Sequence, residues 1–369
     1  MLPPVATILA PSDGMTVSDG QVTLRVLVHS PVKQQIRGVR VLVNGRLDPK
    51  ARGVVDLTAE PGVDAVGSGV EVHSIPVLLP KGESSIAVFA EGTAGASVPA
   101  VIRLRSSATG QSAAAGLDRK PRLVVLAVGV GDYARAELRL NYPAKDARDL
   151  LAVLQAQRSK LYSDVLSRVL VDGEATLEGI RQGLQWLGAT VQPDDTALIF
   201  LAGHGVNDAG NGQYLFLPRD ADLQSLGRTT LPATEIQQVL TALQTRVLLL
   251  LDTCHSGNVM PGRGTRGVGG DITRFVGDLA SVEQGIVVMA ASTGRQASQE
   301  SAQWENGAFT RALVEGLRGG ADFRKTGRVT INMLDLYVSE RVRELTDGMQ
   351  TPATAKPVTI PDFPLVTLP

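Results

Sequence analysis

A single cysteine, Cys254, is the residue whose type and position point most directly to chemistry. It lies in LLLLDTCHSG, directly after an apolar run, and the 369 residues contain no second cysteine. A thiolate is a nucleophile, and a nearby imidazole can take the thiol proton and later protonate a leaving amine. Two histidines qualify: His204, directly after the run ALIFLAG, and His255, next to the cysteine. Adjacent side chains in an extended chain point apart, so His204 is favoured as the base.

The sequence beyond residue 121 predicts a layered α/β domain. Apolar runs of strand length, such as RLVVLAVGVG and TALIFLAGHG, alternate with segments of helical spacing, such as AKDARDLLAVLQAQ and LEGIRQGLQWLG. Two further helices are expected near residues 308–317 and 331–345. Continuous Val/Ile/Leu strands are typical of a parallel sheet whose two faces are covered by helices.

Such a sheet would bring the cysteine and the histidine together. Reactive groups in open α/β sheets collect just beyond the carboxyl ends of the strands. If the strands before His204 and Cys254 are neighbours, both side chains emerge into one crevice. The backbone N–H groups of Gly205 and Cys254 would then be candidate donors to an oxyanion, because glycine allows close approach.

The first part of the chain follows a different pattern. In QVTLRVLVHS, apolar residues alternate with polar ones in period two, and an Asn44-Gly45 pair between strand-like runs indicates a hairpin. We therefore predict a small antiparallel β-sandwich of immunoglobulin-like type over residues 1–105. Residues 106–120 are small, polar and aperiodic and are expected to form a linker to the α/β domain, residues 121–369.

The motifs of the α/β domain resemble a known family. LIFLAGHG and LLLLDTCHSG, with LNYPAKDARDL before them and VVMAASTGRQASQESAQWENGAFTRALVEGL after them, are similar to the caspase-like peptidases of the caspase-hemoglobinase fold. The resemblance is to the metacaspase, paracaspase and bacterial orthocaspase branch, and it covers about Arg122 to Leu345. The spacing of about 50 residues from His204 to Cys254 is that of caspases. The resemblance implies a cysteine endopeptidase with a Cys254–His204 dyad and no cofactor.

The resemblance also implies the specificity. The QACxG signature of animal caspases, which cut after aspartate, is absent. The branch that this chain resembles uses acidic pocket residues to accept arginine or lysine, and Asp146, Asp252 and Glu300 fall at the matching positions. A carboxylate pair would bind a guanidinium through charge-assisted hydrogen bonds. Without the resemblance, Asp146 would be interpreted as an acid at a helix N-terminus and Asp252 as a residue that orients a loop.

Three residues are expected in the substrate groove. Trp304, in QWENGAF, is predicted either to contact the residue before the cleaved arginine or to pack on the surface. The backbone around Ala291 and Ser292 is predicted to pair with an extended substrate as an added strand. Trp186 lies on an amphipathic helix and is interpreted as a packing residue.

A glycine-rich segment, residues 258–278, is a candidate site of processing. It contains three arginines, Arg263, Arg266 and Arg274, and exposed loops are where proteases cut. By resemblance to caspase maturation, the enzyme itself or an upstream protease would cut there and reorder the active-site loops. The alternative is a flexible loop without a regulatory role.

Composition argues against several other partners and compartments. The chain has 36 basic and 37 acidic side chains, which gives no electrostatic reason to expect nucleic acid. No apolar segment approaches the roughly 18 residues of a membrane span, and MLPPVATILAPSDG lacks the pattern of a signal peptide. A lone free thiol suits a reducing compartment, so we expect a cytoplasmic protein without a membrane partner.

Metal binding is a weaker hypothesis. A zinc site built on Cys254, His255, His204 and Asp252 would have poor tetrahedral geometry, because one cysteine with one adjacent histidine is a poor start for it. Asp220 and Asp222 follow the histidine strand but are too few to predict calcium dependence.

Two other functions remain open at this point. One is a catalytically silent caspase-like module for protein interaction, although such modules usually lose the cysteine or the histidine, and Cys254 and His204 are both present. The other is a hydrolase of the same fold with one dedicated protein target, because specificity beyond the first pocket lies in loops.

Overall fold

The computed structural model separates into two compact units, each with its own hydrophobic core. The first unit comprises Met1–Arg119 with Pro357–Pro361, and the second comprises Lys120–Lys356 with Asp362–Pro369. The structure describes residues 3–18, 20–30, 36–44, 46–47, 70–79, 82–92, 95–107, 120–192, 195–208, 210–243, 245–255, 272–279, 286–292, 298–357, 360 and 362–369.

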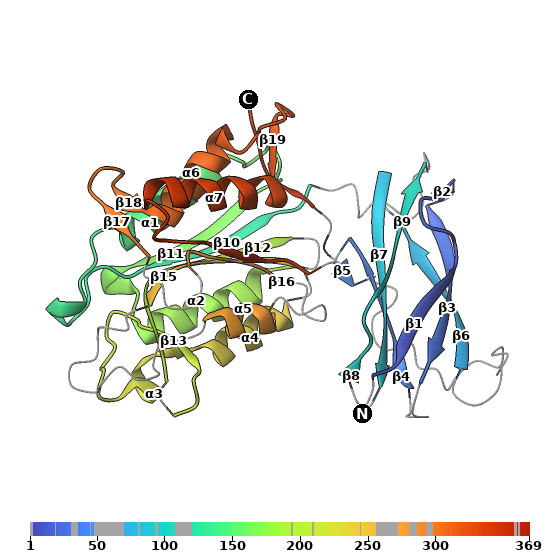
Figure 1. The fold of residues 1–369 in the computed structure, drawn as a ribbon, viewed down its shortest axis with the longest axis horizontal. Coiled ribbons are helices and arrows are strands. Elements are labelled where there is room, and N and C mark those ends of the chain that lie inside the picture. Colours follow the sequence, from blue (N-terminus) through green and yellow to red (C-terminus); the bar gives the residue numbers. More distant parts are fainter. Residues whose placement is uncertain are drawn as a thin grey trace. The chain divides into compact units, whose positions relative to one another are not determined.

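Two β-sheets form the first unit (Figure 1). One holds three antiparallel strands in the order β1-β3-β6, and the other has the order β2-β9-β7-β4-β5, with β8 paired to β7. The bounds are β1 Val5–Ala10, β2 Thr16–Val17, β3 Gln21–His29, β4 Ile36–Val43, β5 Arg46–Leu47, β6 Val70–Leu78, β7 Gly82–Gly92, β8 Gly95–Ala96 and β9 Ala100–Ser106. The prediction of an all-β N-terminal region is confirmed.

The period-two pattern of the sequence explains how these strands pack. On β3, alternate side chains face the core and are fully buried, namely Leu24, Val26 and Val28. The predicted hairpin is present as well, because Val43 pairs with Arg46 and Asn44 between them adopts a φ of 53°. Asn tolerates this left-handed conformation better than most residues do, which suits the tight turn.

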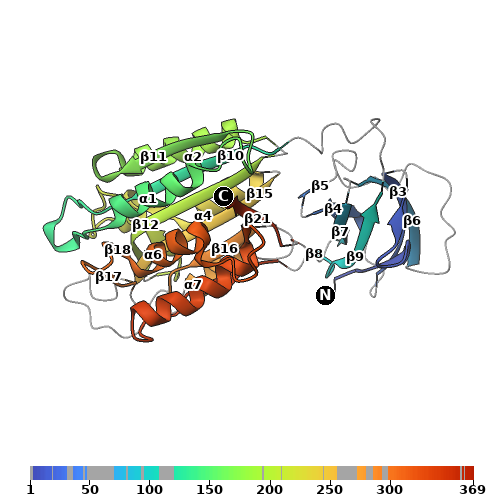
Figure 2. The same ribbon diagram turned by 90° about the horizontal axis from the view of Figure 1, so that it is seen from above.

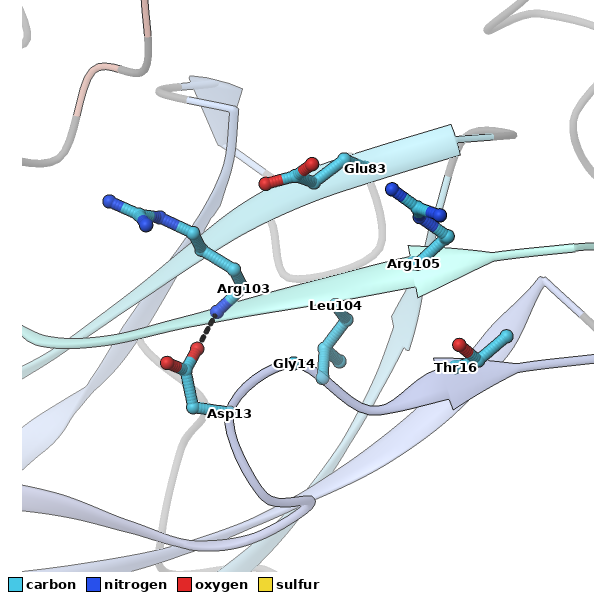
Figure 3. Close-up of a pocket in the computed structure, with 7 residues that line it drawn as sticks. All are labelled: Asp13, Gly14, Thr16, Glu83, Arg103, Leu104 and Arg105. Carbon is cyan, nitrogen blue, oxygen red and sulfur yellow. Dashed lines mark hydrogen bonds between the residues drawn. The ribbon is translucent and has the colours of Figure 1, made fainter.

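A polar hollow of about 310 Å³ lies on the first unit (Figure 3). Its charged lining residues include two guanidinium groups and two carboxylates, from Arg103, Arg105, Asp13 and Glu83. The backbone N–H of Arg103 donates to Asp13 Oδ1 at 2.6 Å, which fixes the chain before β2 against β9. With equal numbers of both charges, the hollow has no preference for a ligand of one sign.

A mixed sheet forms the centre of the second unit, in the order β11-β10-β12-β15-β16-β20 (Figure 2). Neighbouring strands from β11 to β16 are parallel, whereas β20 pairs antiparallel with β16. The expected parallel sheet is therefore correct for five strands, whereas β20, a three-residue edge strand, and β13, which pairs with β12, run antiparallel. The bounds are β10 Leu123–Gly129, β11 Val165–Val171, β12 Thr196–Asn207, β13 Tyr214–Phe216, β14 Leu231–Pro232, β15 Arg246–His255, β16 Ile286–Ala290, β17 Glu300–Ser301, β18 Asn306–Gly307, β19 Arg328–Thr330, β20 Ala353–Ala355 and β21 Pro364–Thr367.

Helices cover both faces of this sheet (Figures 1 and 2). On one face lie α1 (Pro143–Gln155), α6 (Ala308–Glu315) and α7 (Ile331–Leu345); on the other lie α2 (Leu177–Thr190), α4 (Ala233–Ala242) and α5 (Ile272–Leu279). The short helices are η1 Ala136–Leu138, η2 Asp172–Glu174, α3 Leu226–Thr229 and the π-helical turn η3 Gly316–Gly320. The helices predicted from AKDARDLLAVLQAQ, from LEGIRQGLQWLG and near residues 331–345 are confirmed.

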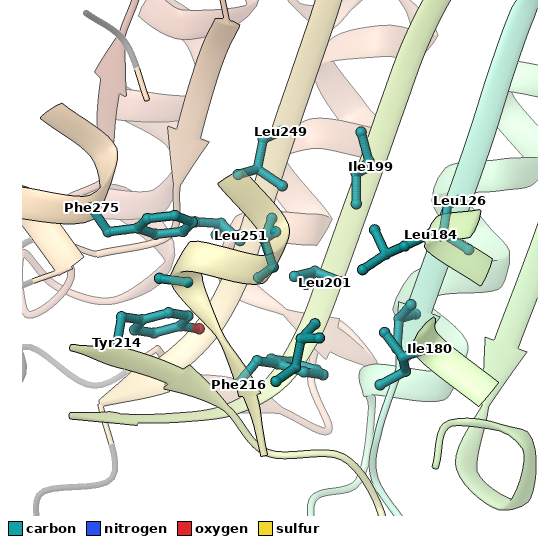
Figure 4. Packing of buried hydrophobic residues seen from close by; sticks show 14 of the residues in the cluster. Leu126, Ile180, Leu184, Ile199, Leu201, Tyr214, Phe216, Leu249, Leu251 and Phe275 are labelled. Carbon is teal, nitrogen blue, oxygen red and sulfur yellow. The ribbon is translucent and has the colours of Figure 1, made fainter. Parts of the chain in front are cut away.

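The core between the sheet and α2, α4 and α5 fixes the strands that carry the site (Figure 4). Alternate side chains of β12 and β15 enter it, including Ile199, Leu201, Leu249 and Leu251. Because this packing sets the register of both strands, it also sets which residues meet at their carboxyl ends. Within the described part of the chain, no helix is both long and apolar enough to span a bilayer.

Candidate active site

The histidine and the cysteine lie opposite each other on adjacent strands. Strands β12 and β15 are parallel, and their register pairs His204 with Cys254 and Gly205 with His255. Neighbouring strands lie about 4.8 Å apart, so the two backbones are at the distance that the sequence argument required. For Cys254 and His255 the structure describes the backbone and not the side chains.

The His204 ring is buried and oriented by a backbone carbonyl. His204 is only 7% exposed, and its Nε2 lies 2.9 Å from the carbonyl oxygen of Leu138. A carbonyl can only accept, so Nε2 carries the proton and Nδ1 is the acceptor nitrogen of the neutral ring. Burial lowers the pKa of His204, which outweighs the opposing effects of the Leu138 carbonyl and of Glu300. The ring is therefore kept neutral, as a general base must be.

Tyr133 fixes the peptide of His204 as well as its ring. The His204 N–H donates to Tyr133 Oη at 2.8 Å, and the two rings lie 5.1 Å apart at 40°. Tyr133 Oη in turn donates to the Leu217 oxygen at 3.2 Å, and the Leu217 N–H donates to the His204 oxygen at 3.0 Å. The sequence reasoning missed Tyr133 and Leu138, because nothing in the spacing of a tyrosine or of a backbone carbonyl marks such a contact.

Both glycines that flank His204 make room for a tyrosine. A Cβ at Gly205 would lie 2.5 Å from the Tyr214 ring, and one at Gly203 would lie 2.8 Å from Tyr133 Oη. Gly203 also has a φ of +146°, a conformation that L side chains rarely adopt. The glycine at 205 is thus explained by packing, whereas the sequence argument had attributed it to the close approach of an oxyanion.

Asp146 and Asp252 lie in one hollow beside this pair of strands. They are 2% and 6% exposed, respectively. The hollow encloses only about 20 Å³, room for about one water molecule, and its lining includes Gly203, one residue before His204. The other lining residues are Leu140, Pro143, Ser298, Gln299, Glu300 and Gly307. All three acids singled out in the sequence are thus brought together next to the strand ends.

The beginning of α6 donates to both buried carboxylates. Asp252 Oδ2 accepts from the Thr310 N–H at 3.2 Å and from Thr310 Oγ1 at 2.6 Å. Both Asp146 oxygens lie 3.2 Å from the Gly307 nitrogen, and Oδ1 also accepts from Asn306 Nδ2 at 2.8 Å. Unpaired N–H groups and the positive end of the helix dipole favour negative charge at this point. These donors, which the sequence reasoning missed, let two acids persist in a buried place.

Burial nevertheless raises the pKa of both acids. For Asp146 the pKa rises to about 8, mainly through desolvation and then through the charge of Asp252, against the hydrogen bonds from Asn306 and Gly307. For Asp252 desolvation raises the pKa to about 6, against the two hydrogen bonds from Thr310. At neutral pH Asp146 therefore holds a proton that a bound cation would displace, whereas Asp252 is mostly ionised.

We expect the Asp146→Asn variant to be more thermally stable than the wild type in alkaline buffer. The folded pKa of about 8 exceeds the ordinary value of 3.8, so the folded state holds a proton that the unfolded state releases. Stability is then lost as the pH rises from near 4 through 8, and an uncharged side chain avoids this loss. The Tm of the variant should exceed that of the wild type by several degrees at pH 9, with a smaller difference at pH 4.

The Asp149→Asn variant is the matched control on the same helix. Burial opposes ionisation of Asp149, but hydrogen bonds from Asn306 and Lys145 prevail and lower its pKa. A lowered folded pKa stabilises the protein above the unfolded pKa, so this variant should lose stability at neutral pH. Equal Tm changes in both variants at every pH would contradict a raised pKa of Asp146 beside a lowered pKa of Asp149.

Glu300 binds the N-terminus of α1 at the rim of the hollow. Its carboxylate accepts from the Asn141 N–H at 3.0 Å, from Asn141 Nδ2 at 2.6 Å and from the Tyr142 N–H at 3.3 Å. The third predicted pocket acid therefore both lines the hollow and holds the segment before α1, which carries Asp146, in place.

The predicted substrate-binding strand at Ala291 and Ser292 is wrong. Ala291 is 1% exposed, its N–H donates to the Leu251 oxygen at 2.8 Å, and its oxygen accepts from Gln350 Nε2 at 2.8 Å. Ser292 is 2% exposed. The Ala291 backbone is thus already hydrogen-bonded inside the domain and is not open to a peptide.

Trp304 lies in the turn between β17 and β18, whose paired residues Glu300 and Gly307 line the hollow. The side chain is partly buried, and its Nε1 is inaccessible to solvent and without a hydrogen-bond partner. The turn places this tryptophan near the hollow, whereas Trp186 packs against the core, as expected.

The predicted processing segment is only partly described. Arg263 and Arg266 lie outside the described residues, so the structure does not test them. The prediction of a loop is wrong at Arg274, whose backbone belongs to α5. The reason is the helical spacing of four buried side chains, Ile272, Phe275, Val276 and Leu279, which face the core.

The acids after the histidine strand have structural partners. Asp220 Oδ1 accepts from the Leu177 N–H at the start of α2, and Asp222 Oδ1 accepts from the Gln224 N–H. In the described portion of the protein, no group of three or more His, Cys, Asp or Glu residues could hold a metal ion.

A sequence model of the caspase domain, peptidase C14, matches residues 122–359. No curated protein matches the chain. Among solved structures, protein GSU0716 from Geobacter sulfurreducens is similar, with 21% identity, a TM-score of 0.46 and coverage of 68% of this chain and 100% of that one. A 2,6-sialyltransferase from Photobacterium sp. JT-ISH-224 has 9% identity, a TM-score of 0.17 and coverage of 65% and 41%. Neither structural likeness bears on function.

Proposed function

This chain belongs to the caspase-domain family of peptidases, and from that premise we propose that it is a cysteine endopeptidase that cleaves proteins after arginine or lysine. Cys254 is the nucleophile and His204 the base and acid. The observation that carries the proposal is one hollow that contains two buried carboxylates, Asp146 and Asp252, next to the paired His204 and Cys254 backbones.

Substrate binding begins with the side chain before the scissile bond. A guanidinium that enters the hollow replaces the proton held there and pairs with the ionised Asp146 and Asp252. Its planar fork of donors suits two carboxylates, so arginine should bind at least as well as lysine. Glu300 adds a third negative charge at the rim. Trp304, in the adjacent turn, contacts the preceding substrate residue with its ring.

Catalysis then uses the neutral imidazole. Nδ1 of His204 takes the proton of the Cys254 thiol, and the thiolate attacks the substrate carbonyl carbon. The resulting oxyanion accepts from the backbone N–H groups of Cys254 and Gly205. The imidazolium returns its proton to the leaving amine as the C–N bond breaks. Water, deprotonated by the same ring, hydrolyses the thioester and restores the thiol.

Two finer features complete the proposal. The β-sandwich of the first unit has an immunoglobulin-like arrangement, which is supported by its two sheets and by the parallel pairing of β2 with β9. The arginines at 263 and 266 are sites at which the enzyme or an upstream protease cuts the chain.

The proposal is tested with fluorogenic peptides that differ only at the cleaved residue. We expect arginine and lysine peptides to be cleaved at least about 100-fold faster, in kcat/KM, than those with an uncharged or acidic residue. Turnover should disappear on alkylation of the single thiol. A preference for aspartate, or turnover that survives alkylation, would refute the assignment.

A further inference from the structure

Gly307 lies against both buried carboxylates. A Cβ built on Gly307 would lie 2.7 Å from Asp252 Oδ2 and 3.3 Å from Asp146 Oδ2. The first distance is shorter than real Cβ contacts, and the second is tighter than most of them. The carboxylates thus fill the space that a side chain at 307 would need.

The backbone gives no reason for glycine at this position. Gly307 has φ −63° and ψ 143°, a conformation that every residue adopts readily. It is the N-cap of α6, where Ser, Thr, Asp and Asn are favoured because their side chains accept from the first N–H groups. Here Asp252, from another strand, accepts from the Thr310 N–H instead. The requirement for glycine therefore comes from the space and not from the turn.

Gly307 cannot move away from the carboxylates. Its N–H is hydrogen-bonded to Asp146, it pairs with Glu300 in the β17–β18 hairpin, and the next residue, Ala308, donates to the Gln299 oxygen at 2.8 Å. Asn306, the preceding residue, is held by hydrogen bonds to Asp146 and Asp149. A side chain at 307 would thus project into the space and would not be accommodated by a shift of the backbone.

Asn306 links the hollow to a second carboxylate of α1. Its Nδ2 donates to Asp146 Oδ1 at 2.8 Å and to Asp149 Oδ2 at 3.0 Å, and Lys145 pairs with Asp149 at 2.6 Å. Asn306 is 2% exposed, so these bonds are shielded from water. They turn Asp146 Oδ1 toward Asn306.

We infer that Gly307 determines the specificity of the hollow, because only glycine leaves room for the carboxylates of Asp252 and Asp146 to face a planar amidinium or guanidinium group together. This inference rests on the proposed function and adds a residue to it. A side chain at 307 would displace the Asp252 carboxylate, the nearer of the two, and so would remove a charge that the cation needs. Gly205 differs, because its missing Cβ makes room for the Tyr214 ring.

The test is the Gly307→Ala variant, compared with Gly188→Ala. Gly188 lies in α2, where an added Cβ meets nothing within 4 Å, so this control should behave as the wild type does. Binding of p-aminobenzamidine, followed by its fluorescence, probes the hollow without catalysis. The reaction of iodoacetamide with Cys254, the single thiol, probes the nucleophile. Arginine-peptide turnover is measured alongside.

The expected result is a loss confined to the hollow. In Gly307→Ala, the Kd for p-aminobenzamidine and the KM for arginine peptides should each rise between about 10-fold and 100-fold. The alkylation rate and its pH profile should stay unchanged. Wild-type binding of p-aminobenzamidine by the variant would overturn the inference. Parallel loss of binding and of thiol reactivity would do so too, since it would indicate a structural role. If the wild type binds the probe but cuts no arginine peptide, the proposed function fails and the inference stands.

Discussion

Replacing Cys254 by alanine is expected to lower kcat for arginine peptides by a factor on the order of 10⁴ or more. The chain contains no other cysteine that could act in its place. Oxyanion donors and substrate binding would account for the residual rate. His204→Ala should cause a loss of similar size, because an unassisted thiol at neutral pH is mostly protonated. Steady-state kinetics with one fluorogenic arginine peptide measures both.

The double variant gives a sharper readout than either single one. If the two groups act as one unit, Cys254→Ala with His204→Ala should lose no more activity than Cys254→Ala alone. His255→Ala is the control, because this neighbour is the competing base; it should keep activity within a few-fold of the wild type. Losses that multiply in the double variant, or a His255 variant as inactive as the His204 one, would contradict the assigned pair.

The buried His204 also predicts the shape of the pH profile. Burial lowers its pKa below the ordinary 6.5, and the base must be neutral to accept the thiol proton. The acid limb of kcat/KM for an uncharged substrate should therefore lie below pH 6.5. The pH dependence of kcat/KM of the wild-type enzyme measures this limb, so no further variant is needed.

Asp252→Asn is expected to remove the preference for arginine. The Asn amide is close in size to the carboxylate and can still accept from Thr310, but it carries no charge to pair with a guanidinium. We expect kcat/KM for arginine peptides to fall by about 10² to 10³, mostly through KM, because a buried cation would lose one of its two carboxylates. The reactivity of Cys254 toward iodoacetamide should stay within about twofold, and a larger change would indicate that Asp252 acts on the nucleophile.

The pH dependence of KM gives a second test of the two acids, because a bound cation displaces their protons. Burial raises the pKa of Asp146 to about 8 and that of Asp252 to about 6, and a bound cation favours the ionised form of both. Cation binding therefore strengthens as the pH rises, so KM for arginine peptides should fall between pH 6 and pH 8 in the wild type. Asp164→Asn, on a surface ion pair with Arg158, should leave this dependence intact. A KM that is flat with pH would contradict the paired-acid description.

The spacing of apolar residues in the sequence was sufficient to predict most of the strands and helices. The alternation of β3, the apolar runs of β10, β12 and β15 and the helical spacing of α1, α2 and α7 each record which side chains face the core. Those periodicities are properties of consecutive residues, so they can be read without knowledge of the fold. The same reasoning put His204 and Cys254 at strand ends, and the register of β12 with β15 agrees.

Pattern was insufficient where long-range contacts decide. Ala291 follows an apolar strand, but its hydrogen bond from Gln350, 59 residues away in sequence, is what closes its backbone to a peptide. Arg274 lies in a glycine-rich neighbourhood, yet the packing of α5 against the core makes that part helical. The contact at Ala291 leaves no signal in the sequence nearby, whereas the helical spacing of Ile272, Phe275, Val276 and Leu279 was a signal that the neighbouring glycines obscured.

The sequence by itself determined the candidate reacting groups, a lone cysteine and a histidine followed by glycine, from residue type and spacing, whereas the acids were assigned by resemblance to a family. Only the tertiary structure decided how these groups are tuned. The pKa of Asp146 depends on burial by α1, β15 and α6 together, and the tautomer of His204 depends on the Leu138 carbonyl, 66 residues away. The requirement for glycine at 307 exists only because Asp146 and Asp252 meet there. Desolvation, hydrogen-bond geometry and free volume are properties of packed neighbours, and the chain acquires them when distant segments come together.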